Sequence, residues 1–177
     1  MSASDDYVVS RCCILNGLFV GFILACQAIK KLLKAFIYLE TEEETKLTGS
    51  DKHNPFKLKE QLQKVKKYEL DKFDSLLKKL HDHYQSRYYD NKVSGRGASS
   101  SELDTIDELW VCLIEALPTP NEVKYRSKFF ADLFDEDSRK YWSNYYWTEK
   151  NNKALAKKIQ EMEFKYKAVF HHLYPKN

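Results

Sequence analysis

The chain has 177 residues, of which 29 are Lys or Arg and 26 are Asp or Glu, so its formal net charge is +3 with histidine neutral. This near balance excludes a global electrostatic field that would draw the protein onto nucleic acid. Five glycines and four prolines are few for this length, which favours long helices over a turn-rich sheet protein. The length predicts one domain, residues 1–177.

A long apolar segment predicts a first helix from Asp6 to Glu40, which contains no proline. Its apolar run from Cys12 to Ile29 falls slightly short of the roughly 20 residues that a membrane span needs. Acidic residues precede it where a signal peptide would carry positive charge. We therefore expect a cytoplasmic protein without a membrane span. The four cysteines form no CxxC pair and are predicted to be reduced core thiols: Cys12, Cys13, Cys26 and Cys112.

A shorter helix is predicted to begin at Asn54-Pro55, with Asn54 as N-cap and Pro55 at the first helical position. Its predicted inner stripe is Leu58, Leu62 and Val65. The next helix carries apolar residues at alternating steps of three and four, which predicts a single buried face. These residues are Leu70, Phe73, Leu77, Leu80 and Tyr84.

Arg87 and Tyr88 continue this apolar stripe beyond Tyr84. An arginine at the end of a buried stripe needs a partner or a ligand, because an unpaired buried charge is costly. One hypothesis is a phosphate or nucleotide site, in which Arg87 offers paired donors and the tyrosines offer stacking faces. The alternative is a structural ion pair between Arg87 and Asp90.

Residues 91–101 have the composition of a mobile loop. Further helices are predicted over residues 102–177. The first resembles a capped helix opened by Ser101 and Asp104 and stopped by the Pro118–Pro120 segment. Its predicted inward residues are Leu103, Ile106, Trp110, Leu113 and Leu117.

Several segments of the chain resemble the HEPN domain family. Residues 6–11, the Leu15-Asn16-Gly17 step and residues 25–35 resemble the family's first helix. The His53-Asn54 loop before a helix is similar to the family's His-Asp-Leu stretch, and residues 84–90 resemble its Arg-Tyr segment. These matches cover roughly residues 6–90. The resemblance implies an all-α, up-and-down helical bundle, HEPN-like, with additional C-terminal helices, often homodimeric.

HEPN domains include ribonucleases, toxins paired with nucleotidyltransferase-like antitoxins, nucleotide-binding modules and inactive scaffolds. The family's ribonuclease motif is an arginine followed four to six residues later by histidine. No arginine of this chain has a histidine at that distance. The resemblance therefore favours a binding protein over an enzyme.

We accordingly predict a non-catalytic HEPN-like binding module, homodimeric, that binds a nucleotide, RNA or a protein partner. The predicted ligand site comprises Arg87, Tyr84, Tyr88 and His53, with Lys31 as a further phosphate contact. No cofactor or metal is predicted, because histidines two residues apart, such as His81 and His83, point away from each other on a helix.

Two other functions stay open. One is a divergent metal-independent ribonuclease of toxin type, in which Arg87 would act with a histidine such as His53. The other is a structural or antitoxin-binding protein, whose contact surface would be the aromatic segment 141–147.

Overall fold

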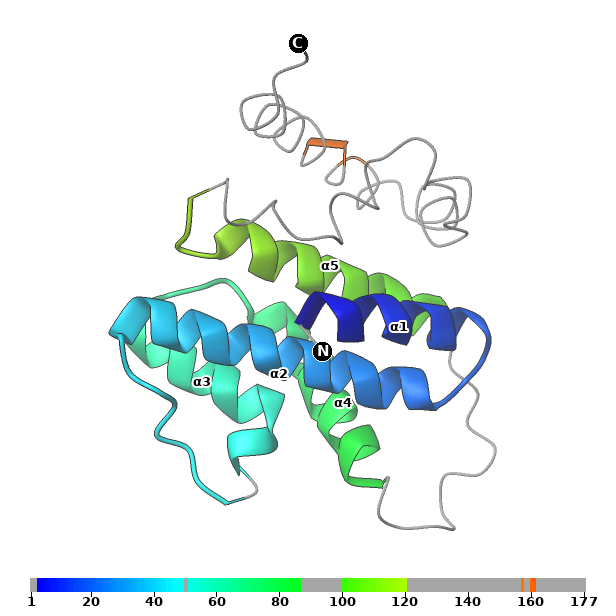
Figure 1. Ribbon diagram of the computed structural model, residues 1–177, viewed down its shortest axis with the longest axis horizontal. Helices are drawn as coiled ribbons and strands as arrows, with labels where there is room; N and C mark the ends of the chain where they lie inside the picture. Colours follow the sequence, from blue (N-terminus) through cyan, green and yellow to red (C-terminus); the bar gives the residue numbers. More distant parts are fainter. Residues whose placement is uncertain (1–2, 50, 87–99, 121–156, 158–159, 162–177) are drawn as a thin grey trace. The chain divides into compact units, whose positions relative to one another are not determined.

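A computed structural model of the chain describes residues 3–49, 51–86, 100–120, 157 and 160–161 (Figure 1). The chain divides into two compact units, residues 1–113 and 114–177. Helices α1 to α4 belong to the first unit, and α5 runs across the division. The described residues form helices and no strand, so the all-α prediction is confirmed. The single-domain prediction stays a prediction.

The predicted first helix is in fact two, α1 (Ala3–Leu15) and α2 (Val20–Thr41). The chain leaves α1 at Gly17, whose φ of +71° lies in the left-handed region where glycine is favoured. The Leu18 amide donates to the Cys13 carbonyl at 2.8 Å, which closes the turn. The prediction of one continuous helix is therefore wrong. The chain reverses here, and α1 packs along α2 (Figure 1).

Helices α1 and α2 approach each other closely at Gly21. A Cβ at this position would lie 2.6 Å from Ile14 Cγ1 and 2.8 Å from the Ser10 carbonyl oxygen. Only a hydrogen fits there without moving backbone. This position sets how tightly α1 docks on α2.

Helix α3 (Pro55–Val65) follows a 3-10 turn, η1 (Asp51–His53). Asn54 Oδ1 accepts hydrogen bonds from the Phe56 and Lys57 amides at 3.0 and 3.4 Å, so the predicted N-cap is confirmed. Leu58 and Leu62 are buried. Val65 is 44% exposed, so its predicted place in the inner stripe is wrong. It is the last residue of α3, and the chain turns to extended backbone at the next residue.

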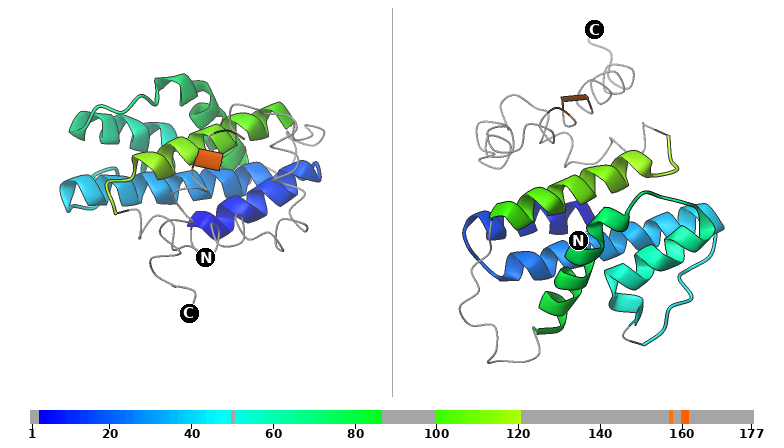
Figure 2. Two further views of the ribbon diagram at one scale, coloured as in Figure 1. Left: turned by 90° about the horizontal axis from the view of Figure 1, so that it is seen from above. Right: turned by 180° about the vertical axis from the view of Figure 1, so that it is seen from behind.

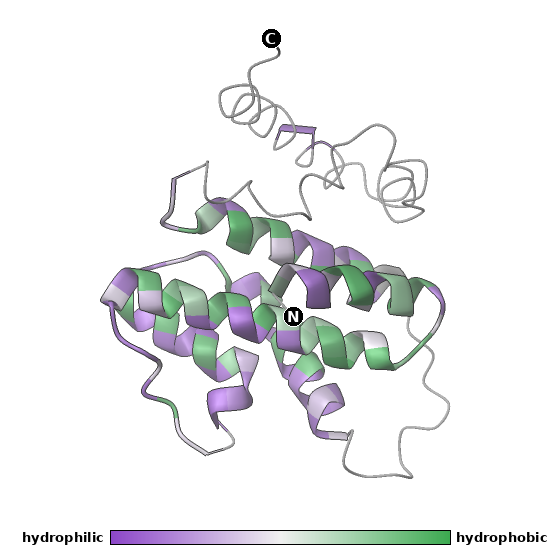
Figure 3. Cartoon of the chain, viewed as in Figure 1, coloured by the Kyte–Doolittle hydropathy of each residue, from purple (hydrophilic) through white to green (hydrophobic). Residues whose placement is uncertain are grey.

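A second 3-10 turn, η2 (Asp71–Phe73), leads into α4 (Asp74–Ser86). The predicted stripe from Leu70 to Tyr84 is buried throughout, as expected from its spacing. Helix α2 packs against α1, α3 and α4 and is the centre of the first unit (Figure 2). Apolar and polar residues alternate along the helices (Figure 3), as amphipathic packing requires.

Helix α5 (Ser100–Ala116) begins inside the segment predicted to be a loop, so that boundary is corrected. It ends before Pro118, as predicted. The side chain of Ser101 and residues 87–99 and 121–156 lie outside the described part. The proposed capping box, the aromatic segment 141–147 and most of the predicted C-terminal helices therefore lie outside the described residues.

None of the four cysteines forms a disulfide, but only Cys26 is buried, whereas Cys12 is exposed. The prediction of core thiols is therefore wrong for Cys12, which lies on the outer side of α1. Within the helices that the structure describes, none has both the length and the apolar character to cross a membrane.

Candidate functional site

Three cationic side chains are buried among the described residues of the first unit: Arg11 on α1, Lys30 on α2 and Lys59 on α3, with 5%, 7% and 3% of their surfaces exposed. An ionised side chain is rarely buried to this degree without an opposite charge. The contacts of Arg11 and of Lys30 therefore indicate whether each charge stabilises the fold or is available to a ligand.

Arg11 has its charge neutralised by Asp107 of α5, with which it forms a buried ion pair. The Tyr7 hydroxyl donates to the other oxygen of the same carboxylate at 2.6 Å. The Tyr7 ring stacks on Trp110, with centroids 4.2 Å apart. These contacts join residues about 100 positions apart and account for the burial of Arg11 structurally.

Lys30 is in a different situation. Its ammonium lies over the ring of Tyr84 on α4, with Nζ 3.7 Å from the ring centroid. No ion pair joins Lys30 to a carboxylate of the described residues, although such pairs hold its neighbour Lys31 and the buried Lys59. A cation–π contact compensates only part of the cost of removing an ammonium from water.

Two further lysines raise the positive potential around Lys30. Burial lowers the pKa of Lys34, and the positive charges of Lys30 and Lys52 lower it further, with Glu44 and Tyr84 opposing the effect. Lys34 lies one helical turn along α2 from Lys30, and Lys52 comes from η1. The unfavourable effect of these ammonium groups on one another means that an anion bound among them would be stabilised.

Two histidines complete the group. The His53 ring lies near-parallel to that of Tyr84, with centroids 6.5 Å apart. His81 precedes Tyr84 by three residues on α4 and therefore shares its face. The Nδ1 atom of His81 is buried and has no hydrogen-bond partner among the described residues.

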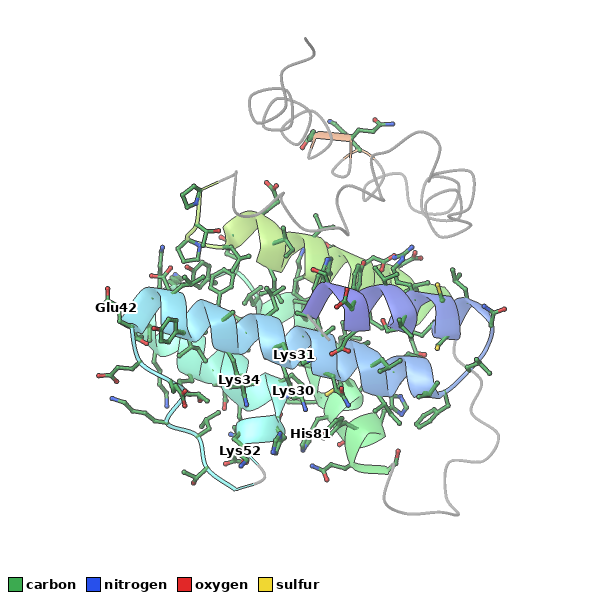
Figure 4. All side chains as sticks on the ribbon, viewed as in Figure 1. Lys30, Lys31, Lys34, Glu42, Lys52 and His81 are labelled. Carbon is green, nitrogen blue, oxygen red and sulfur yellow. The ribbon has the colours of Figure 1, made fainter. Side chains whose placement is uncertain are left out.

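We call this group the basic cluster. It unites side chains of α2, η1 and α4, and the labelled members lie in one region of the molecule where these elements meet (Figure 4). The basic cluster consists of Lys30, Lys34, Lys52, His53, His81 and Tyr84. Its chemistry suits an anion, since the ammonium groups carry positive charge, and both ammonium and imidazole groups donate hydrogen bonds.

The structure brings together two of the residues predicted for the site, His53 and Tyr84. Lys31 instead pairs with the buried Asp6 of α1, at 2.6 Å from Nζ to Oδ2. Arg87 and Tyr88 lie outside the described residues. Four members of the basic cluster are not among the residues predicted for the site: Lys30, Lys34, Lys52 and His81.

Comparisons with protein-family models, with curated proteins and with solved structures found no match to this chain. The function must therefore be argued from the chemistry of the basic cluster.

Proposed function

We propose that this protein is a non-catalytic, HEPN-like binding module that holds the phosphate of a nucleotide or an RNA at the basic cluster. The observation that carries the proposal is Lys30, which is 7% exposed, lies over the Tyr84 ring, and forms no ion pair with a described carboxylate. In the proposed role Lys30 contacts phosphate directly, and Tyr84 positions its ammonium.

A bound phosphate would offset the mutual repulsion of the lysines in the basic cluster, which is uncompensated in the free protein. Three lysines contribute positive charge, and only Glu44 and Tyr84 oppose it in the effect on Lys34. A phosphate among them would form charge-assisted hydrogen bonds, which are roughly twice as strong as neutral ones. Binding would therefore be electrostatic and would weaken as salt concentration rises.

The sequence prediction of Arg87 and Tyr88 as ligand residues extends this proposal. In the sequence they come directly after Ser86, the last residue of α4, and follow Tyr84 by three and four positions. In this role Arg87 would hold a second phosphate oxygen and Tyr88 would stack on a base. The HEPN-like up-and-down topology and the homodimer belong to the same proposal, and the packing of α1 along α2 supports the topology.

Isothermal titration with inorganic phosphate, AMP, ATP and tRNA at low salt tests the proposal. Lys30→Met should weaken binding at least about 10-fold, the loss expected for one charge-assisted contact of about 1.4 kcal/mol. Lys46→Met is the matched control, because the Lys46 side chain is 80% exposed and its ion pair among the described residues is with Glu43. If the wild-type protein binds none of these ligands, or Lys30→Met binds as wild type, the proposal is wrong.

A divergent metal-independent ribonuclease is the second candidate, and the presence of His53 and His81 within the basic cluster favours it. Two imidazoles near a phosphate are the groups that general acid–base cleavage of RNA requires. Incubation of RNA with the protein in the presence of a chelator tests it. Cleavage that is lost in both His53→Ala and His81→Ala would replace the non-catalytic proposal, whereas intact RNA would exclude this activity.

A further inference from the structure

We infer that the basic cluster selects a terminal phosphate monoester, at the end of a nucleotide or RNA strand, over an internal phosphodiester. This inference rests on the proposed function and names the class of phosphate that it binds. Three observations support it: the charge of the cluster, the burial of Lys30 and His81, and the contact between the Tyr84 ring and Lys30.

The charge of the cluster matches a dianion better than a monoanion. Lys30, Lys34 and Lys52 contribute three ammonium groups whose mutual repulsion is felt at Lys34. A phosphate monoester carries about −1.5 to −2 charges near pH 7, since its second pKa is about 6. An internal phosphodiester carries only one. The monoester therefore neutralises more of the uncompensated charge.

Access to the cluster also favours a terminal group. Only 7% of Lys30 is exposed, and Nδ1 of His81 is buried. A phosphodiester carries a sugar on two of its oxygens. To place its phosphate at the buried groups, the protein would have to admit the nucleic-acid strand on both sides of that phosphate. A monoester carries one substituent and presents three oxygens that can accept hydrogen bonds. It can therefore reach Lys30 and His81 end-first.

Tyr84 does not offer a base the stacking face that the sequence hypothesis gave it. Only 7% of the surface of Tyr84 is exposed, and the Lys30 ammonium lies 3.7 Å from the centroid of its ring. The ring is thus already used to hold a cation. Among the described residues, recognition is directed to phosphate, and Tyr84 is a positioning residue.

The test compares two short RNA strands of one sequence, each labelled at the 3′ end, one with a 5′-phosphate and one with a 5′-hydroxyl. Fluorescence anisotropy with the full chain should show at least about 10-fold tighter binding of the 5′-phosphorylated strand. AMP and inorganic phosphate should compete with it, and adenosine should not. Lys30→Met should abolish the preference, while Lys46→Met should retain it.

The outcomes separate this inference from the proposed function. Equal binding of both strands, with a loss of affinity in Lys30→Met, would overturn the selection of a terminal phosphate and leave the phosphate site standing. Binding of neither strand, AMP nor phosphate would overturn both. Lys30→Arg keeps the positive charge, so it should retain part of the preference. The melting temperature of each variant shows whether a loss of binding reflects unfolding.

Discussion

Arg11 and Lys30, two of the buried cations of the first unit, differ in how their charge is compensated. Arg11 is enclosed between α1 and α5, with Asp107 as its counterion and Tyr7 bridging to the same carboxylate. Lys30 is enclosed between α2 and α4 with an aromatic ring and further basic groups around it. The two side chains are almost equally buried.

This difference shows how a structural charge can be told from one that serves a ligand. Burial of a charge together with its counterion fixes the packing of two helices and leaves nothing for a ligand to do. Burial without a counterion carries a cost in the free protein, and such costs are typical of functional sites. The four predictions below test this contrast, from the largest expected effect to the smallest.

Asp107→Ala should lower the free energy of unfolding most. It leaves Arg11 buried without its counterion and removes the acceptor of the Tyr7 hydroxyl, so a loss of about 3–5 kcal/mol is expected. Urea denaturation measures it. The control is the double variant Arg11→Met with Asp107→Leu, which buries no charge and should lose less. An equal loss in both variants would show that packing, not charge, decides stability here.

Gly21→Ala should lower the free energy of unfolding by about 1–3 kcal/mol, because the new methyl group meets the backbone of α1. The atoms in the way are Ile14 N and the Ser10 carbonyl oxygen, each 2.8 Å away, besides the Ile14 side chain. Gly49→Ala is the control, since a Cβ there meets nothing within 4 Å and only the φ of +56° is unfavourable. The same urea measurement should show the smaller loss for Gly49. A loss at Gly21 no larger than at Gly49 would mean that α1 can shift along α2.

Lys30→Met should leave the free energy of unfolding unchanged or raise it, by up to about 1 kcal/mol, because it replaces an uncompensated charge by an apolar group. The lost cation–π contact with Tyr84 limits the gain. Arg11→Met, in contrast, should be destabilising, since it leaves Asp107 buried alone. Parallel urea titrations of both variants decide the point. Losses of similar size would show that Lys30 is compensated after all.

The smallest effect is expected at the partly exposed pair of Lys66 and Glu40, whose side chains are 54% and 14% exposed. Glu40 accepts from Lys66 Nζ at 3.0 Å and from the Tyr68 hydroxyl, and the bond from Tyr68, aided by Lys66, lowers the pKa of Glu40 below 4.5. Such an acid stabilises the fold above its unfolded pKa and loses that contribution as pH falls through its lowered folded pKa. Glu40→Gln should therefore cost less than about 1 kcal/mol at pH 7.

The pH dependence of Glu40→Gln gives the check. Its free energy of unfolding should fall less steeply than that of the wild type as pH is lowered below 4.5, and the two curves should converge in acid. Parallel curves would show that Glu40 contributes nothing to the acid sensitivity of the protein.

Much of the helical core follows from the sequence, because side-chain spacing determines which face is buried. The stripe from Leu70 to Tyr84 is confirmed for that reason. The Asn54 N-cap is confirmed for a local reason, since its side-chain oxygen accepts from amides of the first helical turn. The break at Gly17 was missed. An apolar run gives no sign of reversal when the helices on both sides of the turn are buried. The Asn16-Gly17 pair, a common turn sequence, was the signal that could have located it.

The basic cluster was harder to predict, because its members come from three elements. Lys30 and Lys31 are adjacent between apolar neighbours, and a step of one residue turns a helix by about 100°. Where α4 packs against α2 decides which of the two lysines contacts Tyr84. The apolar spacing within α2 alone cannot predict that packing. The spacing of His81 and His83 argues against a metal pair, and only the step of three residues from His81 to Tyr84 indicates that these two share a face of α4.

The contact between Tyr7 and Asp107 has a consequence for the order in which the chain folds. The two residues are separated by 100 positions, whereas α1 and α2 are joined by a short turn and can pair as soon as both exist. During synthesis, α1 is therefore made long before the carboxylate that neutralises its arginine. Until α5 has been translated, Arg11 lacks its counterion, so the face of α1 that carries it must stay hydrated even when α1 has paired with α2. Burial of the Arg11 face of α1 is thus a late step in folding, because it must wait until Asp107 has been synthesised and α5 can pack.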